Sequence, residues 1–433
     1  MAPLHRPGEV DVASVGDPSL ADESPVTLNP FEPGFFADPY GQYAQLREHD
    51  PVHFSPLEVW VLFRYEDCFR LLRDPSTSVD IRTELELNAE DRRSRFEVFE
   101  ELFPDRDPRD STNMLSADPP DHTRMRKLVS KVFTPRRVDQ LRPMVQQLVD
   151  TTLDGVESRG EMDLIGELAF PLPFTVISEM LGMPDADRDQ LREWSGKMVK
   201  LLDPILTKDE VVAAMEAGDH MFGHVGEVIE WKRHHLADDL LSAMITAEED
   251  GDVLTTEELI DNVGLLFVAG HETTVNLIGN GALALLRHRD QLELLRNDPS
   301  LDANAVDELL RFDSPVQFSR RILTEEVRIG DHVIEPGRFV MTCLGSANRD
   351  ASVFGDNAHE VDIRRPSANR LLSFGSGIHH CLGSALARME AQVALGTLVR
   401  RFPDLDLVEE QPNWNGRIVL RGVTDLAVGW SDN

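Results

Sequence analysis

Residues 259–286 carry apolar side chains on nearly every side when they are drawn as a helix. Such a helix has to be buried all round, so the rest of the chain must fold about it. Thr255 stands three residues before Glu258, the spacing of a capping box, and this predicts where the helix begins. At about 1.5 Å per residue the helix would be roughly 45 Å long. We therefore expect it to cross the molecule as a central element.

The apolar pattern is broken at Ala269-Gly270-His271-Glu272-Thr273-Thr274. Glycine and threonine are weak helix formers, and a carboxylate in an apolar helix is costly unless water or a partner meets it. The Thr273 hydroxyl can bond the Ala269 carbonyl four residues back, which predicts a local bend or widening. Two interpretations stay open at this point: a polar notch that faces a cavity, or a kink whose polar groups satisfy one another.

Other periodic segments favour helices, while the strand-like apolar runs are fewer and short. We therefore expect a mainly α-helical protein with small β-sheets beside a helical body. The predicted helices lie near residues 39–48, 66–72, 122–133, 137–153 and 210–234. The predicted strands lie near residues 59–63, 327–344 with turns at Asp331 and at Pro336-Gly337, and 418–428 with a bend at Gly422.

The chain has 433 residues and a formal net charge of −34 at pH 7. Such a field repels nucleic acid and anionic membrane surfaces, and no apolar run of about eighteen residues is present. We expect a cytoplasmic monomer with neither of these partners. Residues 1–28 are acidic and contain prolines, which predicts a disordered extension. The absence of a linker leaves one large domain or two open on composition alone.

Of the three cysteines, Cys68 and Cys343 are expected to be small buried residues, since no C-x-x-C pair is present. Cys381 stands in Phe374-Gly375-Ser376-Gly377-Ile378-His379-His380-Cys381-Leu382-Gly383. The glycines let the backbone approach a flat group closely, and the N-terminus of the amphipathic helix that follows favours a thiolate. This pattern predicts a metal-ligating cysteine. The loop resembles that of the cytochrome P450 family, Phe-Gly-x-Gly-x-His-x-Cys-x-Gly, at every fixed position.

The resemblance extends over nearly the whole chain in the order of the family's motifs. His122-Thr123-Arg124-Met125-Arg126 is similar to the family's H-x-x-x-R helix, residues 269–274 to its oxygen-binding helix, and Glu308-Leu309-Leu310-Arg311 to its E-x-x-R pair. Ser346-Ala347-Asn348-Arg349-Asp350 is similar to the soluble bacterial branch. The resemblance implies the cytochrome P450 fold, with a long central helix over the haem and a smaller β-rich region. It also implies that residues 29–433 form a single haem domain.

The resemblance implies that Cys381 is the axial ligand of the iron of a haem b. It also implies cationic or hydrogen-bonding partners for the haem propionates, because a buried carboxylate without a partner is costly. Arg320 and Arg321 are both candidates for one of these propionate partners. We prefer Arg321 because of its spacing to the strand. The implied haem contacts are His122, Arg126, Arg321, His379, Phe374, Gly375 and Ala269.

Thr273 and Glu272 match the family's distal threonine and its acidic neighbour. The implied catalytic roles are a hydrogen bond to oxygen for Thr273 and a proton relay for Glu272. The same alignment places five residues at the substrate space, which implies a small, mainly apolar organic substrate. The alternative, that each is a plain core residue, stays open. The five residues are Leu265, Val268, Ala269, Gln317 and Phe318.

The implied activity is that of a haem-thiolate monooxygenase, which inserts one oxygen atom from dioxygen into its substrate. One alternative is a peroxide-driven or coupling enzyme of the same fold, and another is a haem protein that binds or senses a ligand without turnover. Glu272 and Thr273 favour the monooxygenase, because a sensor needs no proton relay. The family's peroxide-using members tend to alter both positions.

No flavin-binding or iron–sulfur segment is present in the chain, so a separate ferredoxin or flavodoxin is expected to supply electrons. A basic run within an acidic protein can steer such a partner. A solvated helix face is the alternative. The basic residues are Arg124, Lys127, Lys131, Arg136 and Arg137, with Arg388 near the ligand helix.

Glu308 and Arg311 are three residues apart and therefore lie on one side of a helix. From spacing alone they form either an exposed ion pair, which contributes little to stability, or a buried ion pair. The resemblance implies the buried pair, which fixes the loop before the haem ligand.

Overall fold

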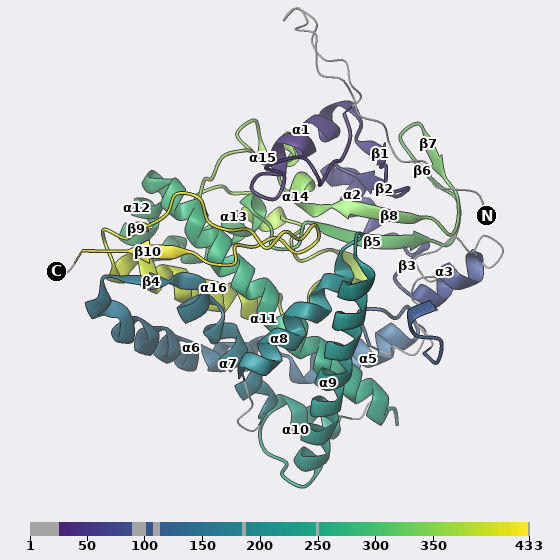
Figure 1. Cartoon of the computed structure of the whole chain (residues 1–433), viewed down its shortest axis with the longest axis horizontal. Coiled ribbons are helices and arrows are strands. Elements are labelled where there is room, and N and C mark those ends of the chain that lie inside the picture. The colour runs from purple at the N-terminus through teal and green to yellow at the C-terminus, as the bar shows by residue number, and fades with distance from the viewer. Residues whose placement is uncertain (1–25, 89–100, 107–112, 184–187, 248–250, 432–433) are drawn as a thin grey trace, which may run out of the picture.

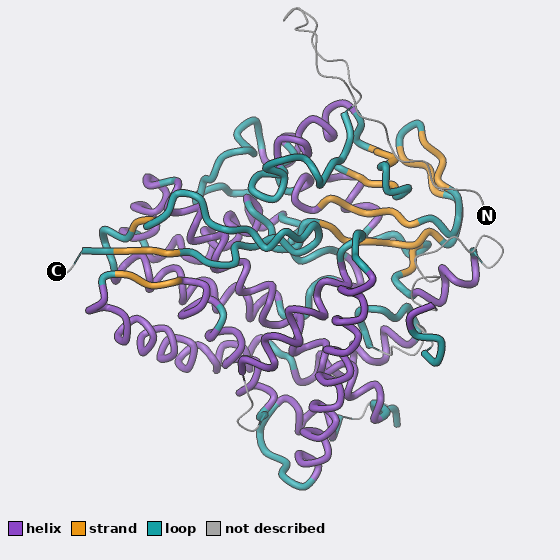
Figure 2. Tube along the Cα trace, viewed as in Figure 1, coloured by secondary structure: helices purple, strands orange, loops and turns teal. Residues whose placement is uncertain are grey.

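The computed structural model describes residues 26–88, 101–106, 113–183, 188–247 and 251–431. Helices form one large body, and the strands gather at its sides (Figure 1, Figure 2), which confirms the predicted mainly α-helical class. The helices are α1 Tyr40–His49, α2 Tyr65–Leu71, α3 Ile81–Leu87, α5 Asp121–Val132, α6 Pro135–Val156, α7 Pro171–Leu181, α8 Arg188–Met198, α9 Lys208–Arg233, α10 Leu240–Ile245, α11 Thr256–Arg287, α12 Arg289–Asn297, α13 Asp302–Phe312, α14 Leu344–Ala347, α15 Ala351–Phe354 and α16 Ser384–Arg401.

Within the described residues, three small sheets accompany the helices. The largest has the strand order β1-β2-β8-β5-β3, in which β2 and β8 are parallel and the other neighbours are antiparallel. In the second sheet β10 lies between β4 and β9, and β6 and β7 form a hairpin. The strands are β1 Val52–Phe54, β2 Trp60–Leu62, β3 Thr77–Ser78, β4 Glu161–Asp163, β5 Phe318–Leu323, β6 Val327–Ile329, β7 His332–Ile334, β8 Phe339–Cys343, β9 Asp406–Leu407 and β10 Ala427–Gly429.

Helix α11 crosses the middle of the molecule (Figure 1). The Thr255 side chain accepts from the Glu258 N–H at 3.1 Å, and the Glu258 carboxylate accepts from the Thr255 N–H at 2.9 Å, so the predicted capping box is confirmed. Thr273 donates to the Ala269 carbonyl at 3.0 Å, as expected. The expected widening is not seen, because the helix stays α-helical along its whole length.

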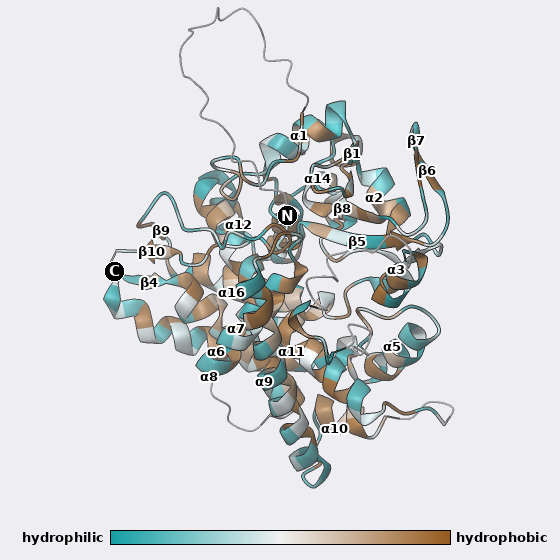
Figure 3. Cartoon of the chain, turned by 45° about the vertical axis from the view of Figure 1, so that its right-hand side comes forward, coloured by the Kyte–Doolittle hydropathy of each residue, from teal (hydrophilic) through white to brown (hydrophobic). Residues whose placement is uncertain are grey.

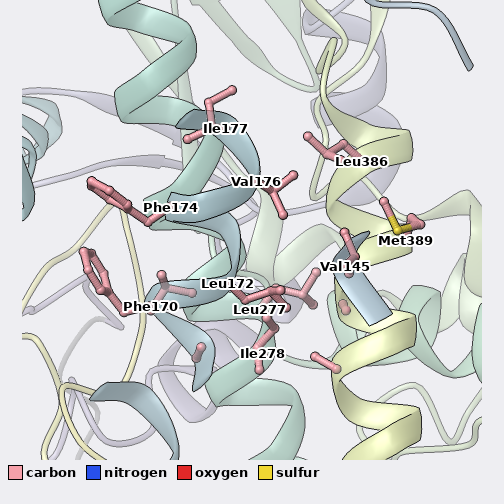
Figure 4. Close-up of a cluster of buried hydrophobic side chains, with 14 of the residues drawn as sticks. Val145, Phe170, Leu172, Phe174, Val176, Ile177, Leu277, Ile278, Leu386 and Met389 are labelled. Atoms are coloured by element: carbon pink, nitrogen blue, oxygen red, sulfur yellow. The ribbon is translucent and has the colours of Figure 1, made fainter. Parts of the chain in front are cut away.

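Helices α6, α7, α11 and α16 pack together in the core. Figure 4 shows Phe174 and Val176 of α7, Leu277 of α11 and Met389 of α16 in one cluster, with Val145 of α6 beside them. Burial of such a side chain contributes about 1.5–3 kcal/mol. Outer helices such as α1 and α9 instead mix hydrophilic and hydrophobic residues (Figure 3). The packing fixes α16, and with it the loop that precedes α16, against α11.

The strand predicted over residues 418–428 is largely wrong, because only Ala427–Gly429 forms a strand there. The backbone N–H groups of Ile418 and Val419 donate to the Asp203 carboxylate at 3.1 and 2.8 Å. A side chain thus satisfies backbone groups that a neighbouring strand would otherwise pair.

The expected N-terminal extension, residues 1–28, falls largely on residues 1–25, which lie outside the described residues. Leu28, at its end, is buried, and its N–H lies 3.3 Å from Nε2 of His53. The single domain over residues 29–433 stays a prediction.

Candidate active site

Two glycines shape the loop before Cys381. Gly375 and Gly377 have φ angles of +68° and +74°, in the left-handed region that favours glycine. A Cβ atom on Gly377 would lie 2.7 Å from the carbonyl oxygen of Leu72, so no other residue fits there without a shift of backbone. The Cys381 N–H donates to the Phe374 carbonyl at 2.9 Å, and α16 begins directly after the loop.

The Cys381 side chain is exposed at the N-terminus of α16. The protein packed around it nevertheless raises the pKa of the thiol, against the opposing effects of the Gly383 N–H and the Arg126 charge. A bound metal cation would favour the thiolate. By contrast, the predicted burial of Cys68 and Cys343 is confirmed.

Four basic side chains meet beside this loop: His122 and Arg126 of α5, Arg321 of β5, and His379. The ring centroids of His122 and His379 are 4.3 Å apart, and neither nitrogen of the buried His122 has a hydrogen-bond partner within the described residues. Burial, and then the charges of the other three groups, lowers the pKa of His379 to about 3. The crowding of basic groups with unpartnered nitrogens fits the two carboxylates of a haem.

Arg321, rather than Arg320, belongs to this basic cluster. Side chains alternate along a strand, and Arg321 is buried while Arg320 is exposed. Burial lowers the pKa of Arg321 to about 10, and the nearby Asp118 carboxylate opposes that shift. Arg126 also donates to the carbonyl of the exposed His380 at 2.6 Å, which ties α5 to the cysteine loop.

One face of α11 is accessible although most of the helix is buried. Ala269 is exposed, and Leu265 and Thr273, one turn to either side, are half-buried. Residues four apart lie on one side of a helix, so these three form a stripe. Val268 and Glu272 flank the stripe and are also half-buried. The polar break in the helix therefore lies at an accessible face.

Gln317 and Phe318 come from the segment that begins β5, and Phe318 belongs to a cluster that Val268 of this face also contacts. Both Gln317 and Phe318 are buried. The Gln317 side chain donates to the Tyr40 hydroxyl at 3.0 Å, and the Phe318 ring packs edge-on against Tyr43, with centroids 5.8 Å apart. These contacts agree with the core role considered as the alternative from the sequence, and the assignment of all five residues to the substrate space stays a prediction.

Glu272 is paired with Arg417, a residue that the sequence analysis did not single out. Oε1 of Glu272 accepts from Nη1 of Arg417 at 2.9 Å. The neighbouring His271 is fully buried, and its Nδ1 lies 2.9 Å from the Phe267 carbonyl. Burial lowers the pKa of His271 and favours the neutral ring. Arg417 is 145 residues from Glu272, and no local pattern links the two.

Glu308 and Arg311 of α13 form a fully buried ion pair with two bonds of 2.7 Å, which confirms the predicted burial. Arg365, which was not predicted, adds bonds of 3.1 and 3.2 Å to the same carboxylate. Arg311 also donates to the carbonyls of Asn348 and Ala358. The network fixes the segment that leads to the cysteine loop.

The predicted basic run is not a continuous set of unpaired charges. Arg388, in particular, bonds Asp307 at 2.6 Å and stacks on the ring of Phe374, 4.5 Å from its centroid, so it supports the cysteine loop. Ion pairs in the run include Arg124–Glu258, Arg137–Asp238 and Arg388–Asp307. The side chains of Lys127, Lys131 and Arg136 are exposed.

The chain matches the family model for cytochrome P450 over residues 64–417. It is 45% identical over 405 residues to cytochrome P450 107B1 of Saccharopolyspora erythraea, covering 92% of this chain and 96% of that one. It is 42% identical over 405 residues to vitamin D(3) 25-hydroxylase of Pseudonocardia autotrophica, covering 92% and 95%. The structure of the tirandamycin C-bound P450 monooxygenase TamI has a TM-score of 0.79 and 38% identity, covering 94% of this chain and 100% of that one.

The fold and the cysteine loop beside a basic cluster define a haem-thiolate oxidoreductase. The chain belongs to the cytochrome P450 family and is a monooxygenase whose cofactor is a haem iron. Within the described residues, no helix has both the length and the apolar character needed to cross a membrane.

Proposed function

We propose that the cofactor is haem b, with Cys381 as the axial ligand. The observation that carries this proposal is the exposed Cys381 thiol at the start of α16, next to a partly buried basic cluster whose two histidine rings lie 4.3 Å apart. In this proposal the cluster holds the propionates, and the glycine-containing loop and the accessible face of α11 contact the porphyrin. The proposed contacts are His122, Arg126, Arg321 and His379 for the propionates, and Phe374, Gly375 and Ala269 for the ring.

When bound, the haem supplies the iron at which dioxygen is activated for insertion of one oxygen atom into the substrate. Thr273 carries a hydroxyl on the accessible face of α11, where rotation about its side-chain bond can turn the proton away from the Ala269 carbonyl. Glu272 carries a carboxylate that can take up a proton and return it through water to that hydroxyl. We therefore assign Thr273 the placing of a proton and Glu272 its replacement.

We propose a small, mainly apolar organic substrate that is hydroxylated or epoxidised. Leu265, Val268 and Ala269 give the accessible face of α11 an apolar character beside Thr273. A relative named for hydroxylation of vitamin D(3), and a similar structure with tirandamycin C bound, support an organic molecule of this kind.

We propose that a separate ferredoxin or flavodoxin supplies electrons and docks near α5 and the start of α6. The exposed basic residues Lys127, Lys131 and Arg136 support this docking face. The net charge of −34 supports a monomer, because like-charged copies repel one another. We also propose a cytoplasmic location, because the net charge of −34 repels anionic membrane surfaces.

The test of the ligand assignment is the absorption spectrum of the ferrous, carbon monoxide-bound protein. We expect the red-shifted Soret band that an anionic sulfur ligand produces, and we expect Cys381→Ser to abolish it. Cys68→Ser, at a buried cysteine, is the matched control and should keep the band. A red-shifted band that persists in Cys381→Ser would refute the assignment.

Turnover separates the monooxygenase from the peroxide-driven alternative. Product formation with a reductase, a ferredoxin and dioxygen is expected, whereas product formed only with added peroxide would favour the alternative.

A further inference from the structure

The guanidinium group of Arg417 joins two helices at once. Its Nη1 donates to Oε1 of Glu272 on α11 at 2.9 Å, and its Nη2 donates to the carbonyl of Gly196 on α8 at 3.1 Å. The side chains of Arg417 and Glu272 are only 14% and 17% exposed, so water competes weakly for this contact. The planar fork of arginine holds two acceptors in a fixed relation. Arg417 lies in neither helix, and it therefore acts as a bridge between them.

A second contact joins α8 to the same turn of α11. Oγ of Ser195 lies 3.2 Å from Nε2 of His271. Because Nδ1 of His271 donates to the Phe267 carbonyl, Nε2 of the neutral ring is an acceptor. The Ser195 hydroxyl shares its proton between this Nε2 and the Arg192 carbonyl, which lies 3.1 Å away. Consecutive residues of α8 are thus bonded, directly or through Arg417, to consecutive residues of α11.

The segment that carries Arg417 is anchored beside α8. The Asp203 carboxylate, in the turn that follows α8, accepts the N–H groups of Ile418 and Val419. The Val419 carbonyl accepts the Gln317 N–H at 2.8 Å. The backbone that follows Arg417 is therefore held in place. A large displacement of α8 would cost the Arg417 guanidinium one of its two acceptors.

We propose that Arg417 is a positioning residue that ties the Glu272 carboxylate to α8, so that α8 docked on α11 holds the proton-carrying group in place. Loss of either contact lets the carboxylate turn away from the accessible face of α11. The inference rests on the proposed proton role of Glu272. According to this inference, the proton role of Glu272 also depends on the position of α8. None of the catalytic motifs in the sequence includes residues of α8.

The first measurement is backbone amide hydrogen exchange in α8 of the haem-loaded, substrate-free protein, with no reductant present. Arg417→Gln should speed exchange in α8 about fivefold, the scale of one lost hydrogen bond, and leave α16 unchanged. Glu272→Gln should leave α8 near its original rate, because Arg417 keeps its bond to Gly196. Arg328→Gln, at an exposed arginine of β6, is the control for the loss of one positive charge.

The second measurement is the ratio of product formed to reductant consumed, together with the solvent deuterium isotope effect on turnover. Arg417→Gln should lower the ratio and change the isotope effect. Arg417→Lys should restore the ratio in part, because an ammonium group still pairs with Glu272. A purely structural role of Arg417 would not produce this recovery.

Unchanged α8 exchange in Arg417→Gln overturns the inference, whatever Glu272→Gln does. A second result also overturns it: Arg417→Gln speeds α8 exchange but leaves the ratio of product to reductant unchanged, while Glu272→Gln lowers that ratio. An unchanged ratio in Glu272→Gln instead refutes the proposed proton role itself, and the inference falls with it.

Discussion

At the residue scale, Thr273 and Thr274 carry adjacent hydroxyl groups in different surroundings. Thr273 is half-buried on the accessible face of α11 and donates to the Ala269 carbonyl. Thr274 is 2% exposed and lies 3.3 Å from the Gly270 carbonyl oxygen. Both side chains bond the carbonyl four residues back, so a comparison of the two positions separates a chemical role from a structural one.

We expect Thr273→Ala to divert reducing equivalents into hydrogen peroxide, because the hydroxyl that places the proton is gone. The measurement is the peroxide released per reductant consumed during turnover. Thr274→Ala is the matched control and should leave that ratio near its original value. Equal ratios in Thr273→Ala and the unchanged protein would remove the assigned role.

The sequence predicts Cys381 but not Arg417, for a physical reason. The cysteine loop is defined by contiguous residues whose backbone demands, such as the left-handed Gly377, are visible in the sequence. The Arg417–Glu272 and Arg365–Glu308 contacts join residues 145 and 57 positions apart and depend on how whole segments pack. The contact of Gln317 with Tyr40 depends in the same way on how the segment before β5 packs against α1.

At the element scale, the carboxylate of Glu308 holds α13 to two other segments through Arg311 and Arg365. All three side chains are buried. Removing one charge from such a network leaves the others without compensation in a medium of low polarity.

We expect Glu308→Gln to lower the free energy of unfolding by about 3–5 kcal/mol, because two buried arginines lose their carboxylate. Denaturant unfolding of the haem-loaded protein measures this loss. Asp302→Asn is the control, since the Asp302–Arg400 pair is 22% and 31% exposed and should contribute less than about 1 kcal/mol. Similar losses in both variants would contradict the buried role.

The capping box of α11 gives a pH dependence. Burial raises the pKa of Glu258, but hydrogen bonds from the Arg124 side chain and the Thr255 N–H outweigh it and hold the pKa below its ordinary value of 4.5. The pKa of Glu258 is therefore lower in the folded than in the unfolded protein, so its ionised carboxylate stabilises the fold fully above pH 4.5. This stabilisation is lost as the pH falls through the folded-state pKa.

We expect Glu258→Gln to lower the free energy of unfolding by about 1 kcal/mol at neutral pH. The difference from the unchanged protein should shrink as the pH falls below 4.5. Denaturant unfolding across this range measures both effects. The control is Glu210→Gln, in the exposed capping box of α9, which should lower the free energy of unfolding by less. If the loss of stability in Glu258→Gln did not vary with pH, this would count against the ion pair of Glu258 with Arg124.

Helices were predicted well because each one carries its own pattern. The segment predicted as residues 137–153 forms α6 over Pro135–Val156, and the capped segment forms α11. The strand expected over residues 418–428 failed because the Asp203 side chain, distant in sequence, occupies the backbone N–H groups there. Local periodicity contains no information about that carboxylate.

At the scale of the whole molecule, the charge of −34 makes any cluster of exposed cations unusual. Lys127 and Arg136 are exposed near α5 and the start of α6, whereas Arg388 is committed to Asp307. The docking face that we propose for an acidic redox partner therefore does not extend to Arg388.

We expect Lys127→Glu and Arg136→Glu to slow reduction by an acidic ferredoxin, most strongly at low ionic strength, because salt screens the attraction. Stopped-flow reduction at several salt concentrations measures this dependence. Arg328→Glu, on β6, is the control and should change the rate little. A slowing that does not vary with salt would argue against electrostatic docking.

The parallel pairing of β2 with β8 sets the order in which the molecule can be assembled. Trp60 pairs with Val340, so the first strands to leave the ribosome wait for most of the chain before their neighbour exists. Cys381 follows soon after that neighbour in the sequence. The five-stranded sheet and the loop proposed to bind the iron thus become complete in the same late stretch of synthesis. If Cys381 is the ligand, cofactor capture is confined to a nearly finished polypeptide.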